Sequence, residues 1–113
     1  MEINISTTGG IKRVPCYGMV SVRVMGEWML FCVTQQAPGW FMNITEYQTG
    51  MSLAKLEDEY GDTFSDPTLY LRVELEHFAR MRVNQMIEKH GELKLAQALK
   101  HHLAQHQANE IDL

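Results

Sequence analysis

The sequence has few of the features that mark a covalent framework or a membrane segment. It contains only two cysteines, Cys16 and Cys32, and neither belongs to a CxxC pair. We therefore expect both to be reduced and buried, rather than part of a disulfide, a metal site or a nucleophile. The longest uncharged apolar run, residues 28–33, is far shorter than the ~20 residues of a membrane-spanning helix. No basic region followed by an apolar stretch opens the chain, so we expect no signal peptide, no membrane association and a cytoplasmic location.

Basic side chains are also scarce. The chain carries 10 Lys and Arg against 14 Asp and Glu, for a net charge of −4. The excess lies in the second half, because residues 57–113 hold six basic against eleven acidic side chains. General nucleic-acid-binding proteins usually present a basic surface. The charge balance therefore disfavours nucleic acid as a partner and is compatible with a basic protein partner.

What is present is typical of one globular domain. The chain has 113 residues, of which 45% are hydrophobic and 21% charged. This length allows one hydrophobic core. We expect a single domain spanning residues 1–113.

Residues 19–56 alternate between apolar and polar side chains, as antiparallel strands do. A two-residue turn at residues 26–27 would place Val24 opposite Met29. A four-residue loop at residues 36–39 would place Val33 opposite Met42. The sequence thus predicts one sheet face rich in valine.

The flanks of this sheet are less regular. Residues 3–7 predict a short edge strand, and residues 51–56 predict the last strand. Residues 7–18 contain three glycines and Pro15, so we expect a loop or an irregular edge there.

Two helices should follow an acidic loop at residues 57–67. Asp66 before Pro67 predicts a helix start, and Gly91 predicts its end. The apolar positions of this helix recur at helical spacing: Leu71, Leu75, Phe78, Ala79, Val83, Met86 and Ile87. A second helix is expected at residues 92–107. The fold class is therefore α+β: an antiparallel β-meander of about four strands followed by two C-terminal helices, the first packed across one sheet face.

The sheet face opposite the valines is too apolar to be fully hydrated. It carries residue types that are enriched at interfaces, namely Arg23, Met25, Trp28, Phe41 and Tyr47. Three interpretations remain open. The face is covered by the second helix or the N-terminal segment, or it binds a protein, or it stacks single-stranded nucleic acid. The acidic balance disfavours the third.

The acidic loop offers a second contact through Glu57, Asp58 and Glu59. It lacks the ligand spacing of an EF-hand, so we expect no calcium site. His102, His106 and Glu110 share a helix face, but no third ligand is fixed for zinc. No Ser-His-Asp or Cys-His set can be assigned. We expect no metal, no cofactor and no catalytic residue.

One stretch carries a resemblance. Residues 40–54, WFMNITEYQTGMSLA, followed by a long helix, resemble a pattern found in small prophage-encoded proteins. The pattern is a strand with Asn-Ile-Thr, a Thr-Gly turn and another apolar strand, and it covers 15 of the 113 residues. The resemblance implies an accessory protein of a phage or mobile element that binds and modulates a host protein.

We therefore expect a non-enzymatic protein-binding module, assembled as a homodimer. The alternative is a small-molecule-binding protein or a small enzyme. Its pocket would lie between the sheet and the second helix, with Cys32 or a histidine inside.

Overall fold

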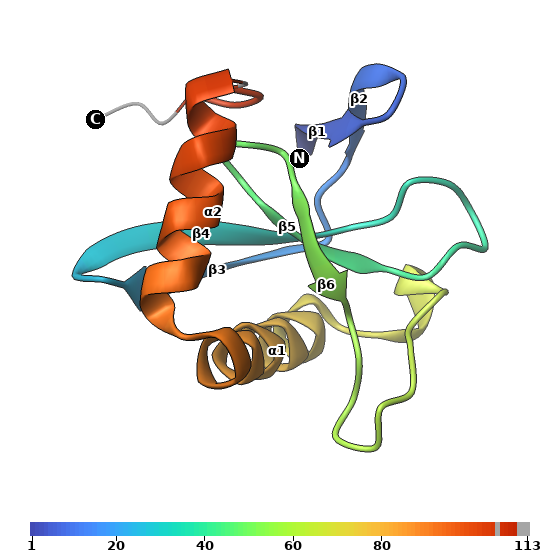
Figure 1. Ribbon diagram of the computed structural model, residues 1–113. Coiled ribbons are helices and arrows are strands. Elements are labelled where there is room, and N and C mark those ends of the chain that lie inside the picture. The colour runs from blue at the N-terminus through green and yellow to red at the C-terminus, as the bar shows by residue number, and fades with distance from the viewer. Residues whose placement is uncertain (106, 111–113) are drawn as a thin grey trace.

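The computed structural model describes residues 1–105 and 107–110. Its elements run in chain order (Figure 1) as β1 (Glu2–Thr7), β2 (Gly10–Pro15), β3 (Gly18–Val24), β4 (Glu27–Thr34), β5 (Asn43–Glu46), β6 (Ser52–Lys55), a 3₁₀ turn (Pro67–Leu69), α1 (Arg72–His90) and α2 (Glu92–Gln105). Strands β3 to β6 form a four-stranded meander, and β1 pairs with β2 in a separate sheet. All these pairs are antiparallel. The fold is α+β, as expected.

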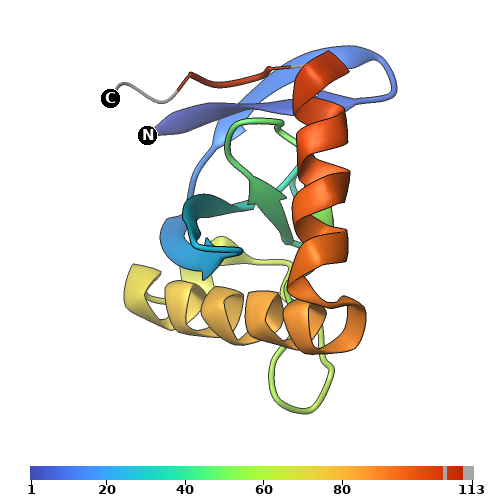
Figure 2. The same cartoon turned by 60° about the vertical axis from the view of Figure 1, so that its left-hand side comes forward.

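The four-stranded sheet lies between two covering layers (Figure 2). The valine face packs on α1 and on Leu95, Ala96 and Leu99 of α2. The other face meets the β1–β2 hairpin through Ile3, Ile5, Val14, Cys16 and Cys32. Helix α2 runs along the side of all three layers. The expected packing of the first helix across one sheet face is confirmed.

The β3–β4 hairpin turns one residue earlier than expected. Its central residues are Met25 and Gly26, with φ of 52° and 80°. Two positive φ values are those of a type I′ turn, which matches the twist of the strands. Val24 therefore pairs with Glu27 and Val22 with Met29, so the expected register was wrong by two positions. The valines stay on the buried face because side chains alternate with a period of two.

The β4–β5 register was wrong by two positions as well. Val33 pairs with Ile44 instead of Met42. The connection is longer than four residues because the side-chain amide of Gln35 holds it from inside. That amide donates to the carbonyl of Trp40 at 2.6 Å and to the carbonyl of Ser65 at 2.7 Å. Met42 still reaches the core, where it is fully buried.

The expectation of a loop over residues 7–18 was wrong, because β2 occupies Gly10–Pro15. Pro15 is the last residue of the strand and pairs with Glu2 at the open end of the hairpin. A proline at a strand end removes no interior ladder hydrogen bond.

Helix α1 begins at Arg72, later than expected. Asp66 caps a 3₁₀ turn instead, where its Oδ1 accepts from the Thr68 N–H at 3.0 Å and the Thr68 hydroxyl at 2.6 Å. These hydrogen bonds lower the pKa of Asp66. Leu71 then precedes the helix, and its N–H donates to the Glu74 carboxylate at 3.1 Å. Its side chain is 67% exposed rather than part of the core.

The far ends of the helices follow the sequence more closely. Gly91 ends α1 as expected, with φ of 82° and its N–H donating to the Ile87 carbonyl. Helix α2 is described to Gln105, and Gln107 is not helical. His106 lies outside the described residues.

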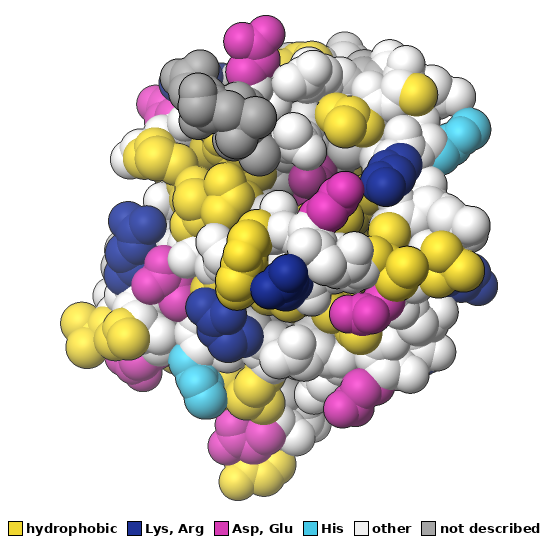
Figure 3. Space-filling view, turned by 90° about the vertical axis from the view of Figure 1, so that its left-hand side faces the viewer, with side chains coloured by type: hydrophobic (Ala, Val, Ile, Leu, Met, Phe, Trp, Pro, Cys, Tyr) yellow, Lys and Arg dark blue, Asp and Glu magenta, His cyan; other side chains and the backbone are white. Residues whose placement is uncertain are grey.

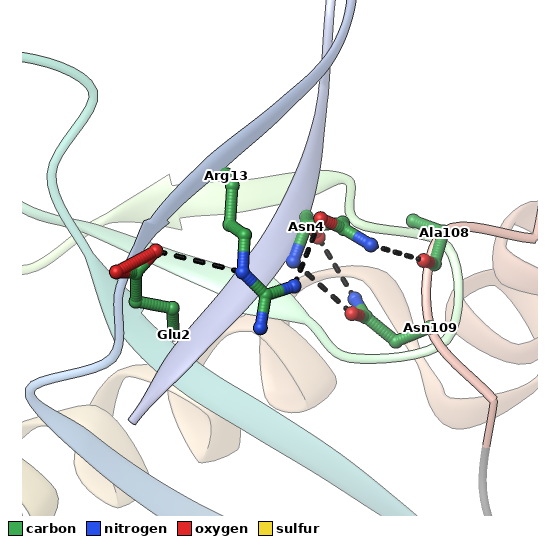
Figure 4. Close-up of polar contacts among 5 residues, drawn as sticks. All are labelled: Glu2, Asn4, Arg13, Ala108 and Asn109. Atoms are coloured by element: carbon green, nitrogen blue, oxygen red, sulfur yellow. Dashed lines mark hydrogen bonds and ion pairs between the residues drawn. The ribbon is translucent and has the colours of Figure 1, made fainter.

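The last described residues tie the chain back to β1 (Figure 4). The side-chain Oδ1 of Asn109 accepts from the Asn4 N–H at 3.0 Å, and its side-chain Nδ2 donates to the backbone carbonyls of Asn4 at 2.8 Å and Tyr47 at 2.7 Å. The Asn4 side chain donates to the Ala108 carbonyl at 3.1 Å. Gly50 permits this approach, because a Cβ there would lie 2.8 Å from the Ala108 Cβ.

Asn109→Ala should lower the free energy of unfolding by about 1–3 kcal/mol, because it removes three hydrogen bonds and leaves half-buried backbone groups without partners. Urea unfolding of the purified protein measures the change. Asn84→Ala is the matched control, since Asn84 is exposed on α1 and should change stability by less than about 0.5 kcal/mol. Equal stability of the two variants would show that the Asn109 side chain does not hold β1.

Candidate protein-binding surface

The expected contact residues do not gather on one surface. Arg23, Met25 and Trp28 lie at the tip of the β3–β4 hairpin. Phe41 lies just before β5, beyond the opposite end of β4 and about 20 Å away along that strand. Tyr47 is half-buried and packs against the cluster beneath the β1–β2 hairpin.

The N-terminal segment covers the middle of the outer sheet face, which was one of the three interpretations of that face. Cys32 is fully buried there, and Met19 is partly buried against the same cluster. The N-terminal hairpin therefore occupies the area that an aromatic platform for single-stranded nucleic acid would need. The hairpin tip remains uncovered.

We call Arg23, Met25 and Trp28 the tip patch. Arg23 lies directly opposite Trp28 in the strand pair, with its guanidinium carbon 5.9 Å from the centre of the indole ring. This is a cation–π contact. Trp28 is 66% exposed and Met25 is 52% exposed. The tip patch therefore presents a large aromatic ring, a flexible thioether and a positive charge side by side.

Figure 3 looks onto the side of the molecule that carries this tip. Hydrophobic side chains on it are interleaved with basic and acidic ones and do not form a continuous apolar area. Mixed surfaces of this kind are typical of non-obligate interfaces, whose polar rim surrounds a few large anchors.

Met25 is held in a backbone conformation that does not suit it. It is the only non-glycine residue with positive φ in the described part of the chain. A left-handed conformation costs a residue with a Cβ about 1–2 kcal/mol, and Asn, Asp or Gly are the usual residues at this position of a type I′ turn. The exposed side chain gains too little burial to offset that cost. Nothing else within the described fold offsets the cost of this conformation.

The acidic loop is shaped by its own carboxylates. Glu57 forms an ion pair with Arg82 of α1 at 3.1 Å. Asp58 accepts from the N–H groups of Tyr60 and Asp62 at 2.8 and 3.0 Å. Glu59 has no ion pair or hydrogen bond among the described residues. Two of the three expected contact carboxylates therefore hold the loop in place.

A second exposed apolar area was missed by the sequence reasoning. Leu69, Leu71 and Val73, at the start of α1, are each about two-thirds exposed or more. A hollow of about 400 Å³ beside them is lined by Val73, Glu74, His77 and Phe78. The sequence carried little signal for this helix start, because leucine offers no side-chain acceptor at the N-cap and only the Glu74 carboxylate reaches back to the Leu71 N–H.

The alternative interpretation requires a pocket between the sheet and α2, and the space there is small. The hollow there, between Trp28 and Met29 on one side and Leu99 and Leu103 on the other, measures about 90 Å³. Sites for small molecules usually hold about 300–1,000 Å³. Cys32 is not among its lining residues. A wider groove of about 630 Å³ lies elsewhere, between the N-terminal hairpin, Trp40 and His102.

The described residues hold no cluster of three or more His, Cys, Asp or Glu side chains placed to bind a metal ion. His102 lies in α2, while its expected partner His106 falls outside the described residues. Within residues 1–105 and 107–110, neither helix combines the length and the apolar character needed to cross a membrane.

Met25→Asn should raise the free energy of unfolding by about 0.5–1 kcal/mol, because asparagine adopts positive φ more readily. Urea unfolding measures it, with Met51→Asn as the control outside the turn. A loss of stability in Met25→Asn would mean that the methionine side chain supports the fold itself.

Comparison with known proteins gives no counterpart for this chain: no family model matches it, and neither the curated proteins nor the solved structures contain a significant match. The tip patch therefore has to be judged on its own chemistry.

Proposed function

We propose that this protein is a non-enzymatic protein-binding module that binds through the tip patch, and that its first partner is a second copy of itself. The observation that carries the proposal is Met25. It is strained in a tight turn, it is exposed, and it stands beside an exposed Trp28. The fold gains nothing from this choice of residue, whereas an interface would.

The chemistry of the tip patch suits a two-fold contact. Tryptophan, methionine and arginine are all enriched at interfaces, and tryptophan and arginine dominate hot spots. A two-fold axis beside the hairpin would bring Met25 of one copy against Trp28 of the other, twice. A sulfur–aromatic contact contributes about 0.3–1.5 kcal/mol each time. The stacked guanidinium of Arg23 would add a polar contact at the rim.

The resemblance to prophage proteins extends the same proposal to a foreign partner. An accessory protein of a phage or mobile element would bind a host protein with this patch, either as the dimer or in competition with it. Nothing in the proposal requires catalysis or a cofactor.

A second candidate function has one observation in its favour. The groove of about 630 Å³ is within the size range of ligand sites and is lined by Trp40, Gln36 and His102 among others. This combination of an aromatic side chain with polar groups would suit a small molecule. A compound screen read by thermal unfolding, repeated on Trp40→Ala, separates this function from protein binding.

Light scattering on the purified protein tests the proposal. We expect the native chain to have twice the monomer mass, and Arg23→Glu/Trp28→Ala to have the monomer mass with an unchanged far-UV circular dichroism spectrum. Trp40→Ala is the matched control, because Trp40 is equally a half-exposed tryptophan but lies outside the tip patch. It should remain a dimer.

A native monomer would refute the homodimer and leave a foreign partner as the test of the tip patch. The native protein and the double variant would then be compared as baits in extracts of the source cell. A prey retained equally by both baits would contradict the proposed surface.

A further inference from the structure

The groove of about 630 Å³ lies between the N-terminal hairpin, the loop that follows β4, the start of β6 and α2. Its walls combine the ring of Trp40, the thioether of Met51, the amide of Gln36, the imidazole of His102 and four hydroxyl side chains. Among the described residues that line it, none is Asp, Glu, Lys or Arg. The groove therefore offers one large aromatic ring within a polar surface that holds no carboxylate and no ammonium or guanidinium group.

Trp40 stands on a loop that the fold holds in place. The residue is 55% exposed. Its carbonyl accepts from the side-chain amide of the buried Gln35 at 2.6 Å, and its N–H donates to the Ala37 carbonyl at 3.1 Å. The Lys12 ammonium donates to the Gln36 carbonyl and so ties the N-terminal hairpin to the same loop. A ligand that stacks on Trp40 would meet a preorganised ring, so little ordering entropy would oppose its binding.

Two of the groove hydroxyls already donate their protons within the protein. The Ser6 hydroxyl donates to the Thr49 carbonyl at 2.7 Å, and the Thr7 hydroxyl donates to the Gly10 carbonyl at 2.7 Å. A hydroxyl group has one proton and two lone pairs. Both oxygens can therefore only accept hydrogen bonds from a ligand. A carboxylate or phosphate brings acceptors alone and does not match them, whereas a ligand with its own hydroxyl groups does.

From these features we infer that the groove binds a neutral sugar, which stacks the C–H face of its ring on Trp40 and donates hydroxyl protons to Ser6 and Thr7. A pyranose ring has C–H groups on one face and hydroxyl groups around its rim. The C–H groups carry partial positive charge and face the negative side of the indole ring. The Gln36 amide and the Thr8 hydroxyl are the donors that the sugar oxygens would meet.

This inference names the ligand class of the groove. It therefore rests on the second candidate function and is independent of the tip patch.

A titration of the full chain, followed by nuclear magnetic resonance, tests the inference. The chain has two tryptophans, so its nitrogen–proton correlation spectrum contains two indole N–H signals, and Trp40→Ala identifies the signal of Trp40 by its loss. The probes are methyl glucoside, methyl galactoside, methyl mannoside and N-acetylglucosamine at tens of millimolar. We expect at least one of them to shift the Trp40 signal saturably and to leave the Trp28 signal in place.

Substitutions at the ring separate stacking from a general effect on the fold. Trp40→Ala should weaken binding of that sugar by about tenfold or more, whereas Trp40→Phe should retain part of the affinity because a ring remains. The backbone amide signals of residues 6–8 report binding in these variants. Trp28→Ala is the matched control and should bind as the native chain does. Equal affinity of Trp40→Ala and the native chain would overturn the inference.

Two further comparisons test the chemical class. Fluorine in place of a sugar hydroxyl cannot donate a hydrogen bond, so a fluorinated analogue at one or more ring positions should bind several-fold more weakly than the parent sugar. Equal binding of all the fluorinated analogues would contradict the donation to Ser6 and Thr7. A sugar phosphate should bind no more tightly than the parent sugar.

The remaining outcomes distinguish the inference from the functions proposed above. A shift of the Trp40 signal by adenosine monophosphate or by a sugar phosphate, but by none of the neutral sugars, would show a ligand site and overturn the sugar class. A Trp40 signal that no probe moves would overturn both the sugar class and the second candidate function. Neither outcome would change the light-scattering test of the tip patch.

Discussion

The burial of β4 on both of its faces is the constraint on which the rest of the structure depends. Phe31, Cys32 and Val33 are consecutive and all completely buried, and consecutive strand residues point to opposite faces. An antiparallel sheet often leaves one face to water, but this one cannot. The helices therefore cover the valine face, and the β1–β2 hairpin has to cover the other. A two-stranded hairpin is marginal on its own, and hydrogen bonds from the backbone N–H groups of Ser6 to Gly50 and of Asn4 to Asn109 anchor this one to the rest of the chain.

The outer edge of β3 is also partly covered. An exposed edge offers unpaired backbone groups to any other strand. Here α1 covers the first part of the edge, because the Glu76 carboxylate accepts from the Met19 N–H at 2.8 Å and Arg80 donates to the Ser21 carbonyl at 2.8 Å. Gly18 allows the helix this close, since a Cβ there would lie 2.8 Å from the Cγ of Glu76. Strand addition is thus blocked along this part of β3, and contact through side chains at the hairpin tip is the mode of binding that the edge leaves open.

The sequence predicted what depends on local pattern and failed where distant segments decide. The valine face was predicted correctly although both hairpin registers were wrong, because the error was two residues each time and alternation has a period of two. The local sequence could not show whether Gly26 is the first or the second central residue of the turn. A type I′ turn places Met25 first, where Asn, Asp or Gly is usual. The role of Asn109 was invisible, because its partner Asn4 is 105 residues away. The covering of Cys32 by the N-terminal hairpin also depends on tertiary structure, which the local sequence does not show.

The expected contact residues were predicted only in part. Arg23, Met25 and Trp28 lie together at the hairpin tip. Phe41 lies in the loop before β5, and Tyr47 packs beneath the N-terminal hairpin.

One feature of the fold is not required by this packing. The turn at Met25 needs a residue that accepts positive φ, and asparagine or glycine would serve without the strain. Consistent choices at all other levels make such departures informative, since natural sequences break local rules mainly where function imposes another demand. This departure lies on the surface, beside the exposed ring of Trp28.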